Sequence, residues 1–215
     1  MYPRALLLAA AVCLMTSFTV LRAEPSTEAK VYKLDGTIMV EHVDEAGVKT
    51  QFALATNGVV TRGDILTVYD KSWVILKDAK GDAIGFDGPA LAAFDELFKG
   101  GPDRQVRILL KSGKCLVKSK NSGSRQSFFE VHTGSLVSVL GNSRAAFDYD
   151  PEANRVEISY FGGKLKTTDA DGERKFYLNS IRVWEKGKLT QGDPMPLPEE
   201  TSLSFKRFFD GQPHR

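Results

Sequence analysis

The sequence predicts an all-β protein, a layered β-roll or sandwich-like domain of short antiparallel and stacked strands with one short helix. Two observations favour this fold class. Apolar residues recur at every second position over most of the 215 residues, which is the spacing of a strand that buries one face. Gly and Asp interrupt these apolar runs at intervals of roughly ten residues, and both residues tolerate the backbone angles of chain reversals.

Residues 1–23 are interpreted as a signal peptide and are set aside from the fold. Arg4 precedes an apolar run over residues 5–21, and Ala23 supplies a small residue of the kind found before signal-peptidase cleavage sites. We therefore expect cleavage after Ala23 and a periplasmic or secreted location. An uncleaved membrane anchor is the alternative, because the run approaches the roughly 17 to 25 residues of a membrane helix.

The charge and cysteine content of the mature chain argue against a nucleic-acid partner and a disulfide scaffold. Cleavage removes Arg4 and Arg22 and leaves 192 residues with 27 basic and 27 acidic side chains, so the formal net charge is zero. Nucleic-acid-binding proteins instead concentrate Lys and Arg against phosphates. Cys115 is the single cysteine of the mature chain and lies in an apolar run, so we expect an inert, buried thiol.

The stretch over residues 58–86 shows the strand pattern most clearly. Its even-numbered apolar residues predict one face that lies on the core: Leu66, Val68, Val74, Leu76, Ile84 and Phe86. Odd positions also carry apolar residues, so we expect the second face to be covered too: Ile65, Tyr69, Trp73 and Ile75.

Six residues are assigned to structural turns between strands: Gly63, Asp64, Gly81, Gly113, Gly141 and Gly163. The triplet Arg62-Gly63-Asp64 could also serve as an adhesion site, but a turn that opens the next strand explains the same residues, and we favour the turn. Glycines that stand just before apolar runs form a weak internal echo, which suits a layered sheet. They are Gly36, Gly113, Gly163 and Gly187.

Residues 89–99 depart from the strand pattern and predict one short helix. Pro89 stands at the start and Gly100-Gly101 at the end, as is typical of helix boundaries. The apolar residues between them recur at helical spacing: Leu91, Phe94, Leu97 and Phe98.

Residues 191–215 are assigned to a Pro-rich linker and a C-terminal tail. The segment 199–209 predicts a helical tail with an aromatic and basic face. We favour a tail that is frayed or docked on the core, and contact with a partner or a membrane surface is the alternative.

The sequence shows no familiar catalytic or metal-binding pattern, so we assign no catalytic, cofactor-binding or metal-binding residue. His42, His132 and His214 are not spaced as ligand pairs, and no nucleophile elbow, phosphate loop or Cys-x-x-Cys motif occurs. We expect His132 at the surface. Two acidic turns, 148–152 and 169–173, each offer at most three carboxylates, so hairpin turns explain them better than calcium sites.

Five short motifs follow one another in order through the mature chain. They are Gly63-Asp-Ile-Leu66, the series Ser72, Val74, Leu76 and Gly81, Leu110-Lys-Ser-Gly113, Phe129-Glu-Val-His-Thr133, and Ile158-Ser-Tyr-Phe-Gly-Gly163-Lys-Leu165. Their order and spacing resemble the FecR domain. That family occurs in the periplasmic part of bacterial regulators of sigma factors and in free-standing envelope proteins.

The chain departs from the FecR pattern in two motifs and in its organisation. The family's Gly-Thr-x-Phe is Gly141-Asn-Ser-Arg144 here, and Val68 replaces a Thr. The cytoplasmic anti-sigma helices of the regulators are not expected, because the export signal starts at residue 1. The resemblance implies a β domain over residues 24–190, an envelope setting, and contact with partner domains of transport receptors.

The function expected from the sequence is that of a non-enzymatic periplasmic module for protein binding, signalling or scaffolding. A passive structural or peptidoglycan-associated envelope protein is the alternative, and an enzyme of unfamiliar type is a third. Strands covered on both faces leave little room for a deep pocket, so we expect a sheet edge or loops to bind an envelope protein or peptide. The sequence leaves the oligomeric state open.

Overall fold

The computed structural model describes residues 28–44, 46–78, 81–97, 105–120, 128–190 and 192–211. Within these ranges one sheet of 15 strands and one short helix, α1 (Glu199–Phe209), confirm the all-β fold. The described part of the chain holds no helix long and apolar enough to cross a membrane. The signal-peptide assignment of residues 1–23 lies outside the described residues.

The strands are short near both ends of the chain and long in its middle. They are β1 (Glu28–Asp35), β2 (Ile38–Val43), β3 (Lys49–Ala53), β4 (Val59–Thr61), β5 (Ile65–Val68), β6 (Trp73–Lys77), β7 (Ala83–Glu96), β8 (Gln105–Lys118), β9 (Phe128–Thr133), β10 (Leu136–Asp150), β11 (Arg155–Asp169), β12 (Gly172–Lys175), β13 (Ser180–Glu185), β14 (Lys188–Leu189) and β15 (Met195–Pro196).

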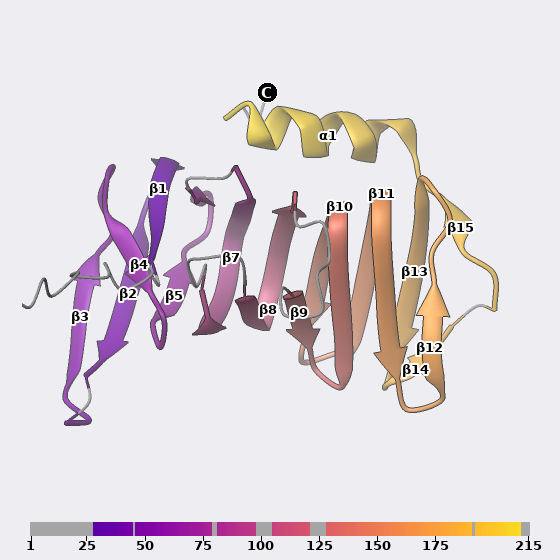
Figure 1. Cartoon of the computed structure of the whole chain (residues 1–215), viewed down its shortest axis with the longest axis horizontal. Helices are drawn as coiled ribbons and strands as arrows, with labels where there is room; N and C mark the ends of the chain where they lie inside the picture. Colours follow the sequence, from indigo (N-terminus) through magenta and orange to yellow (C-terminus); the bar gives the residue numbers. More distant parts are fainter. Residues whose placement is uncertain are drawn as a thin grey trace, which may run out of the picture.

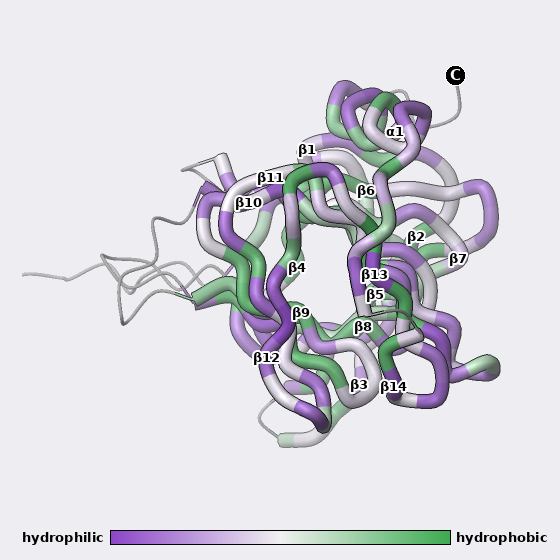
Figure 2. Tube along the Cα trace, turned by 90° about the vertical axis from the view of Figure 1, so that its right-hand side faces the viewer, coloured by the Kyte–Doolittle hydropathy of each residue, from purple (hydrophilic) through white to green (hydrophobic). Residues whose placement is uncertain are grey.

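The sheet runs in the order β14-β13-β11-β10-β9-β8-β7-β5-β2-β3, with β1, β4, β6, β12 and β15 attached beside this path. Pairing is antiparallel except between β8 and β9, which are parallel. Figure 1 shows the strands following one another along the long axis of the molecule, and Figure 2 shows the chain winding around a common centre. The sheet therefore forms a roll around one elongated core.

Bends inside the long strands let the sheet curl. The pairing of β7 with β8 shifts register between Asp87 and Leu91, and the pairing of β10 with β11 shifts around Arg144. Such irregularities bend a strand and increase its local twist. Gly113, Gly141 and Gly163 lie in these bent parts of β8, β10 and β11, and not in loops between successive strands.

The even-numbered residues predicted to face the core are all buried, as expected: Leu66, Val68, Val74, Leu76, Ile84 and Phe86. The second face is covered only in part. Trp73 and Ile75 are buried in a separate outer cluster, whereas Ile65 is half-buried and Tyr69 is exposed. The covered part of this outer face is where α1 docks.

The helix predicted over residues 89–99 is wrong, because residues 83–96 form strand β7. The segment also has a period-two pattern, in which Ala90, Ala92 and Phe94 are buried. β7 pairs with β5 on one side and with β8 on the other, so both rows of its backbone groups find partners. Pairing with two neighbours therefore overrides a local pattern that also fits a helix.

The single helix lies instead at the C-terminal tail, where α1 crosses the outer face of the roll (Figure 1). Phe205 and Phe208 point into the outer cluster and are 7% and 2% exposed. Phe208 meets Trp73 edge-on with ring centroids 6.0 Å apart. A Cβ on Gly85 would lie 2.2 Å from the Phe208 ring, so the absence of a side chain there lets α1 approach the sheet.

Comparing two glycines of the predicted turns distinguishes the cost of a strained backbone angle from the cost of a steric clash. Gly63 and Gly163 both have positive φ, but a Cβ meets nothing at Gly63 and would lie 2.0 Å from the Asn142 carbonyl oxygen at Gly163. We expect Gly63→Ala to cost about 1 kcal/mol from φ strain alone and Gly163→Ala clearly more. Urea unfolding of both variants measures this, and equal losses would contradict the bend assigned to Gly163.

Docking of α1 can be tested through Phe208. Phe208→Ala should lower the free energy of unfolding by about 3 kcal/mol, because it leaves a cavity over Trp73. It should also shift the tryptophan emission to longer wavelength as Trp73 gains water. Leu203→Ala is the control, since Leu203 lies on the same helix and is 45% exposed. A Phe208→Ala protein that melts and fluoresces like the control would rule out the docked helix.

Candidate functional site

The turn residues predicted at Gly63 and Asp64 join β4 to β5, and the Asp64 carboxylate holds this turn. Asp64 is 2% exposed, and its Oδ2 accepts hydrogen bonds from the Thr61 backbone N–H at 2.7 Å and the Thr61 hydroxyl at 3.1 Å. Its Oδ1 lies 2.5 Å from Nδ1 of His42 on β2. A carboxylate buried in this way is not presented to an adhesion receptor, which supports the structural interpretation.

The other residues singled out in the sequence also have structural partners. Gly81 precedes β7, and the Lys120 ammonium lies where a Cβ would point. His132 is half-buried on β9, with Nε2 3.1 Å from Glu130. Burial raises the pKa of Glu130, but hydrogen bonds from Arg107 and His132 outweigh it, and the net shift is downward.

Cys115 is completely buried in the inner core, as expected from its apolar run. Burial raises the pKa of its thiol far above the usual range, because a thiolate would be stripped of water there. The thiol is therefore held in its neutral, unreactive form.

The second acidic turn holds a buried side-chain network. Asp169 Oδ2 accepts hydrogen bonds from the Trp184 indole at 3.0 Å and from Arg174 Nε at 2.9 Å, and its Oδ1 accepts the Asp171 backbone N–H at 2.9 Å. These donors tie β11 to β12 and β13. Burial raises the pKa of Asp169, but the three hydrogen bonds and the Arg174 charge together bring it below its ordinary value.

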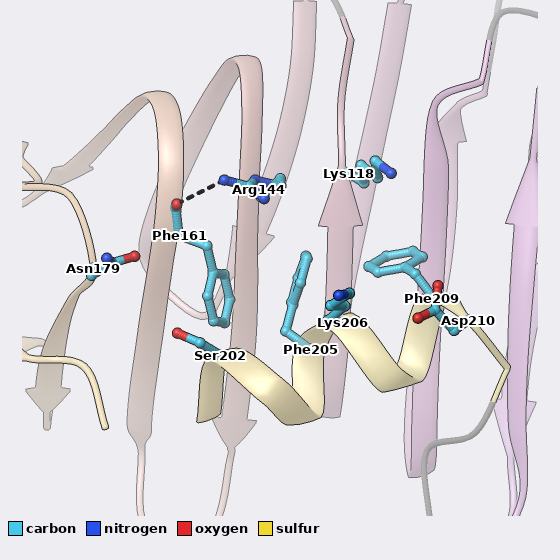
Figure 3. Close-up of a pocket in the computed structure, with 9 residues that line it drawn as sticks. All are labelled: Lys118, Arg144, Phe161, Asn179, Ser202, Phe205, Lys206, Phe209 and Asp210. Atoms are coloured by element: carbon cyan, nitrogen blue, oxygen red, sulfur yellow. Dashed lines mark hydrogen bonds between the residues drawn. The ribbon is translucent and has the colours of Figure 1, made fainter. Parts of the chain in front are cut away.

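A pocket of about 380 Å³ lies between α1 and strands β8, β10 and β11 (Figure 3). Its apolar wall is made by Phe161 and Phe205, whose ring centroids are 4.2 Å apart. Basic side chains stand around this wall, together with one carboxylate. The lining residues are Lys118, Arg144, Phe161, Asn179, Ser202, Phe205, Lys206, Phe209 and Asp210. The expectation that two covered faces leave little room for a pocket does not hold where α1 bridges the strands.

An adjoining hollow of about 370 Å³ shares Lys118 and Arg144 with this pocket and adds Lys120 and Asn142. The bend in β10 brings Arg144 to the boundary between the two. Asn142 has a φ of 47°, and Arg144 lies opposite Lys118 on β8 and Gly162 on β11. Bulges of this kind redirect side chains and are often found beside functional sites.

A second candidate surface is the edge formed by β3, the last strand in the sheet order. All five β3 residues are exposed, and within the described residues β2 is its only partner. The Leu54 N–H donates to the Ile38 carbonyl at 2.8 Å, and the Asp44 N–H donates to the Val48 carbonyl at 3.1 Å. These two bonds lie at the two ends of the β2–β3 pair, so they fix which β3 residues bond to β2 and which point their backbone groups away from it. The N–H and C=O groups of residues 49, 51 and 53 therefore point away from β2.

Apolar side chains accompany this free edge. Phe52 pairs with Val40, a residue buried in the inner core, yet Phe52 is 40% exposed because no described strand follows β3 on that side. Val48 and Val43, at the hairpin that joins β2 to β3, are 57% and 36% exposed. Within the described part of the chain, the edge thus presents both backbone groups without a strand partner and an uncovered piece of the core layer.

The fold and these two surfaces define a single-sheet β-roll with a docked C-terminal helix, a free edge and a basic-aromatic pocket. Neither a protein-family model nor a curated protein matches the sequence. The roll is similar to two crystal structures, at 1.65 and 2.50 Å resolution, of a "putative anti-sigma factor" from Parabacteroides distasonis ATCC 8503.

Both matches have a TM-score of 0.54 and cover 66% of this chain and 64% of the Parabacteroides chain, with 10% and 8% sequence identity. The chain therefore spans slightly less than two thirds of that protein. At this identity the likeness is one of fold. It agrees with the β architecture expected from the sequence.

The Asp169 network predicts how stability depends on pH. Because the pKa of Asp169 is lower in the folded chain than the unfolded value of about 3.9, its stabilisation is complete above that value and is lost as pH falls through the folded pKa. Asp169→Asn should cost about 1 to 3 kcal/mol at pH 7, since Trp184 and Arg174 lose their charged acceptor. Urea unfolding from pH 7 to pH 2 should show the two proteins converging in acid, and a constant difference would contradict this role.

Proposed function

We propose that this chain is a non-enzymatic, exported module of FecR type that binds an envelope protein through the free edge at β3. The observation that carries the proposal is the combination of outward backbone groups on residues 49, 51 and 53 with a half-exposed Phe52. A partner segment in extended form can add a strand there, with main-chain hydrogen bonds for affinity and side-chain contact with Phe52 for specificity.

The chemistry of the edge favours an extended peptide segment over a folded surface. The outward N–H and C=O groups can form a regular row of hydrogen bonds only with a segment that runs alongside β3. Docking of a folded surface through side chains would not use these backbone groups. An added strand would continue the core layer beyond Phe52 and remove its ring from water. The fold shared with the Parabacteroides protein supports a regulatory or signalling setting for such binding.

Electrostatics further limits the kind of partner. The mature chain has equal numbers of basic and acidic side chains, so long-range steering of a charged partner is weak. At the edge itself, Lys49 Nζ forms an ion pair with Glu41 at 2.8 Å, so the exposed residues of β3 carry little net charge. We therefore expect modest affinity with little dependence on salt.

The edge is tested by crosslinking in cells that export the protein. A photo-reactive residue in place of Gln51 should crosslink to one protein partner, and the same residue in place of Tyr177, which is 70% exposed elsewhere, should not. Gln51→Pro should abolish the complex and leave the fold intact, because it removes an N–H that points away from β2. The yield of the complex should be similar at low and high salt.

Two results would overturn the proposal. The first is a crosslink from position 51 to a second copy of this chain, which would make the edge a self-association surface. The second is a complex that survives both Gln51→Pro and Phe52→Lys. Tyr177→Lys is the matched control for the second substitution, since it exchanges an exposed aromatic residue for Lys away from the edge.

A further inference from the structure

We propose that the pocket beneath α1 binds a small amphiphilic anion, with an oxyanion head at Lys118 and Arg144 and an apolar part against Phe161 and Phe205. This site is separate from the β3 edge, and the inference does not depend on the proposed function. It rests on the charge, the shape and the polar contacts of the two adjoining hollows.

The first argument is a pair of cations that lack a carboxylate partner. Arg144 on β10 is the direct cross-strand neighbour of Lys118 on β8, and both side chains are exposed. Figure 3 shows the Arg144 guanidinium turned toward Phe161 and the Lys118 ammonium pointing away from it. Neither side chain forms an ion pair with a carboxylate of the described residues. An anion at the boundary of the two hollows would be attracted by both charges.

The second argument is the unused hydrogen-bonding capacity of Arg144. Its Nη2 donates to the Phe161 carbonyl at 3.3 Å, which orients the guanidinium at the mouth of the pocket (Figure 3). A guanidinium has five N–H donors, and no other acceptor among the described residues is in hydrogen-bonding contact with it. Its planar fork is suited to two oxygens of one carboxylate or phosphate group.

The third argument is the distribution of polarity within the pocket. Lys118 and Arg144 lie on the boundary shared by both hollows, so a head group held there can reach both sides. On one side are the buried rings of Phe161 and Phe205 and the half-buried Phe209, which suit a short apolar chain or ring. On the other side are Lys120 and Asn142, which suit the polar end of the head group.

The size and net charge of the pocket agree with such a ligand. A volume of about 380 Å³ lies in the range of roughly 300 to 1,000 Å³ that is typical of small-molecule sites. Three cations and one carboxylate, Asp210, line the pocket, so its charge favours an anion. A bare inorganic anion would make no use of the aromatic wall, and a neutral amphiphile would gain nothing from the positive charge of Lys118 and Arg144.

Titration calorimetry on the mature protein tests the site with four probes: octyl phosphate, octanoate, octyl glucoside and inorganic phosphate. Octyl phosphate or octanoate should bind at least ten-fold more tightly than octyl glucoside and inorganic phosphate, and a comparison of the first two identifies the preferred head group. Binding of the anionic amphiphile should weaken as salt rises. Equal affinity for octyl glucoside, or no binding of either anionic amphiphile, would overturn the proposal.

Variants then separate a binding role from a structural one. Arg144→Gln and Lys118→Gln should each weaken the anionic amphiphile about ten-fold, while Lys111→Gln, an exposed change on the same strand β8, should have no effect. Without ligand, the melting temperature of Arg144→Gln should change little, because the side chain is exposed and makes one long hydrogen bond, to the Phe161 carbonyl at 3.3 Å. Unchanged affinity in both pocket variants would place the ligand elsewhere and refute the assignment.

Discussion

The inner core of the roll is the interaction on which the rest of the structure depends. Apolar side chains at alternate positions meet along its whole length, from Ala29 on β1 to Trp184 on β13. At roughly 25 cal/mol per Å² of buried apolar surface, such a core is the dominant favourable term, and no disulfide within the described residues assists it. The curl of the sheet, its bent long strands and the glycines at those bends all follow from the need to close around this core.

The outer cluster, in which Phe205 and Phe208 of α1 pack on Trp73, is a second constraint. It shows the difference between structure that repeats locally, which the sequence predicts, and contacts between distant residues, which it does not. Period-two spacing identified the inner residues of β5, β6 and β7 because each buried face repeats locally. Ala90, Ala92 and Phe94 fit a strand, but helical spacing with Pro89 at the start fits a helix, and only pairing with β5 and β8 decides between them. The helix at residues 199–209 was predicted from its own pattern, whereas its place over Trp73 depends on residues far away in sequence.

The candidate sites were harder to predict because each joins residues distant in the chain. The pocket brings together β8, β10, β11 and α1, and no local motif links Lys118 to Phe205. The sequence also favoured a sheet edge or loops for binding, but it could not identify β3, because strand order is set by pairing and not by spacing. Of the six predicted turn residues, Gly113, Gly141 and Gly163 lie in bent strands and Asp64 holds a turn through its hydrogen bonds. They did not point to either candidate site.

The two ends of the roll differ in a way that directs where a partner can add. At the C-terminal end, β13 is followed by β14 and β15, each two residues long, and Asp169 joins β11, β12 and β13 through buried bonds. Very short edge strands offer too few backbone groups to recruit another chain. At the other end β3 is five residues long and all five residues are exposed, with Phe52, 40% exposed, at the margin of the core layer. Among the described strands, β12 and β4 also pair on one side alone, but they are four and three residues long, so β3 is the longest strand of the described residues with a single partner.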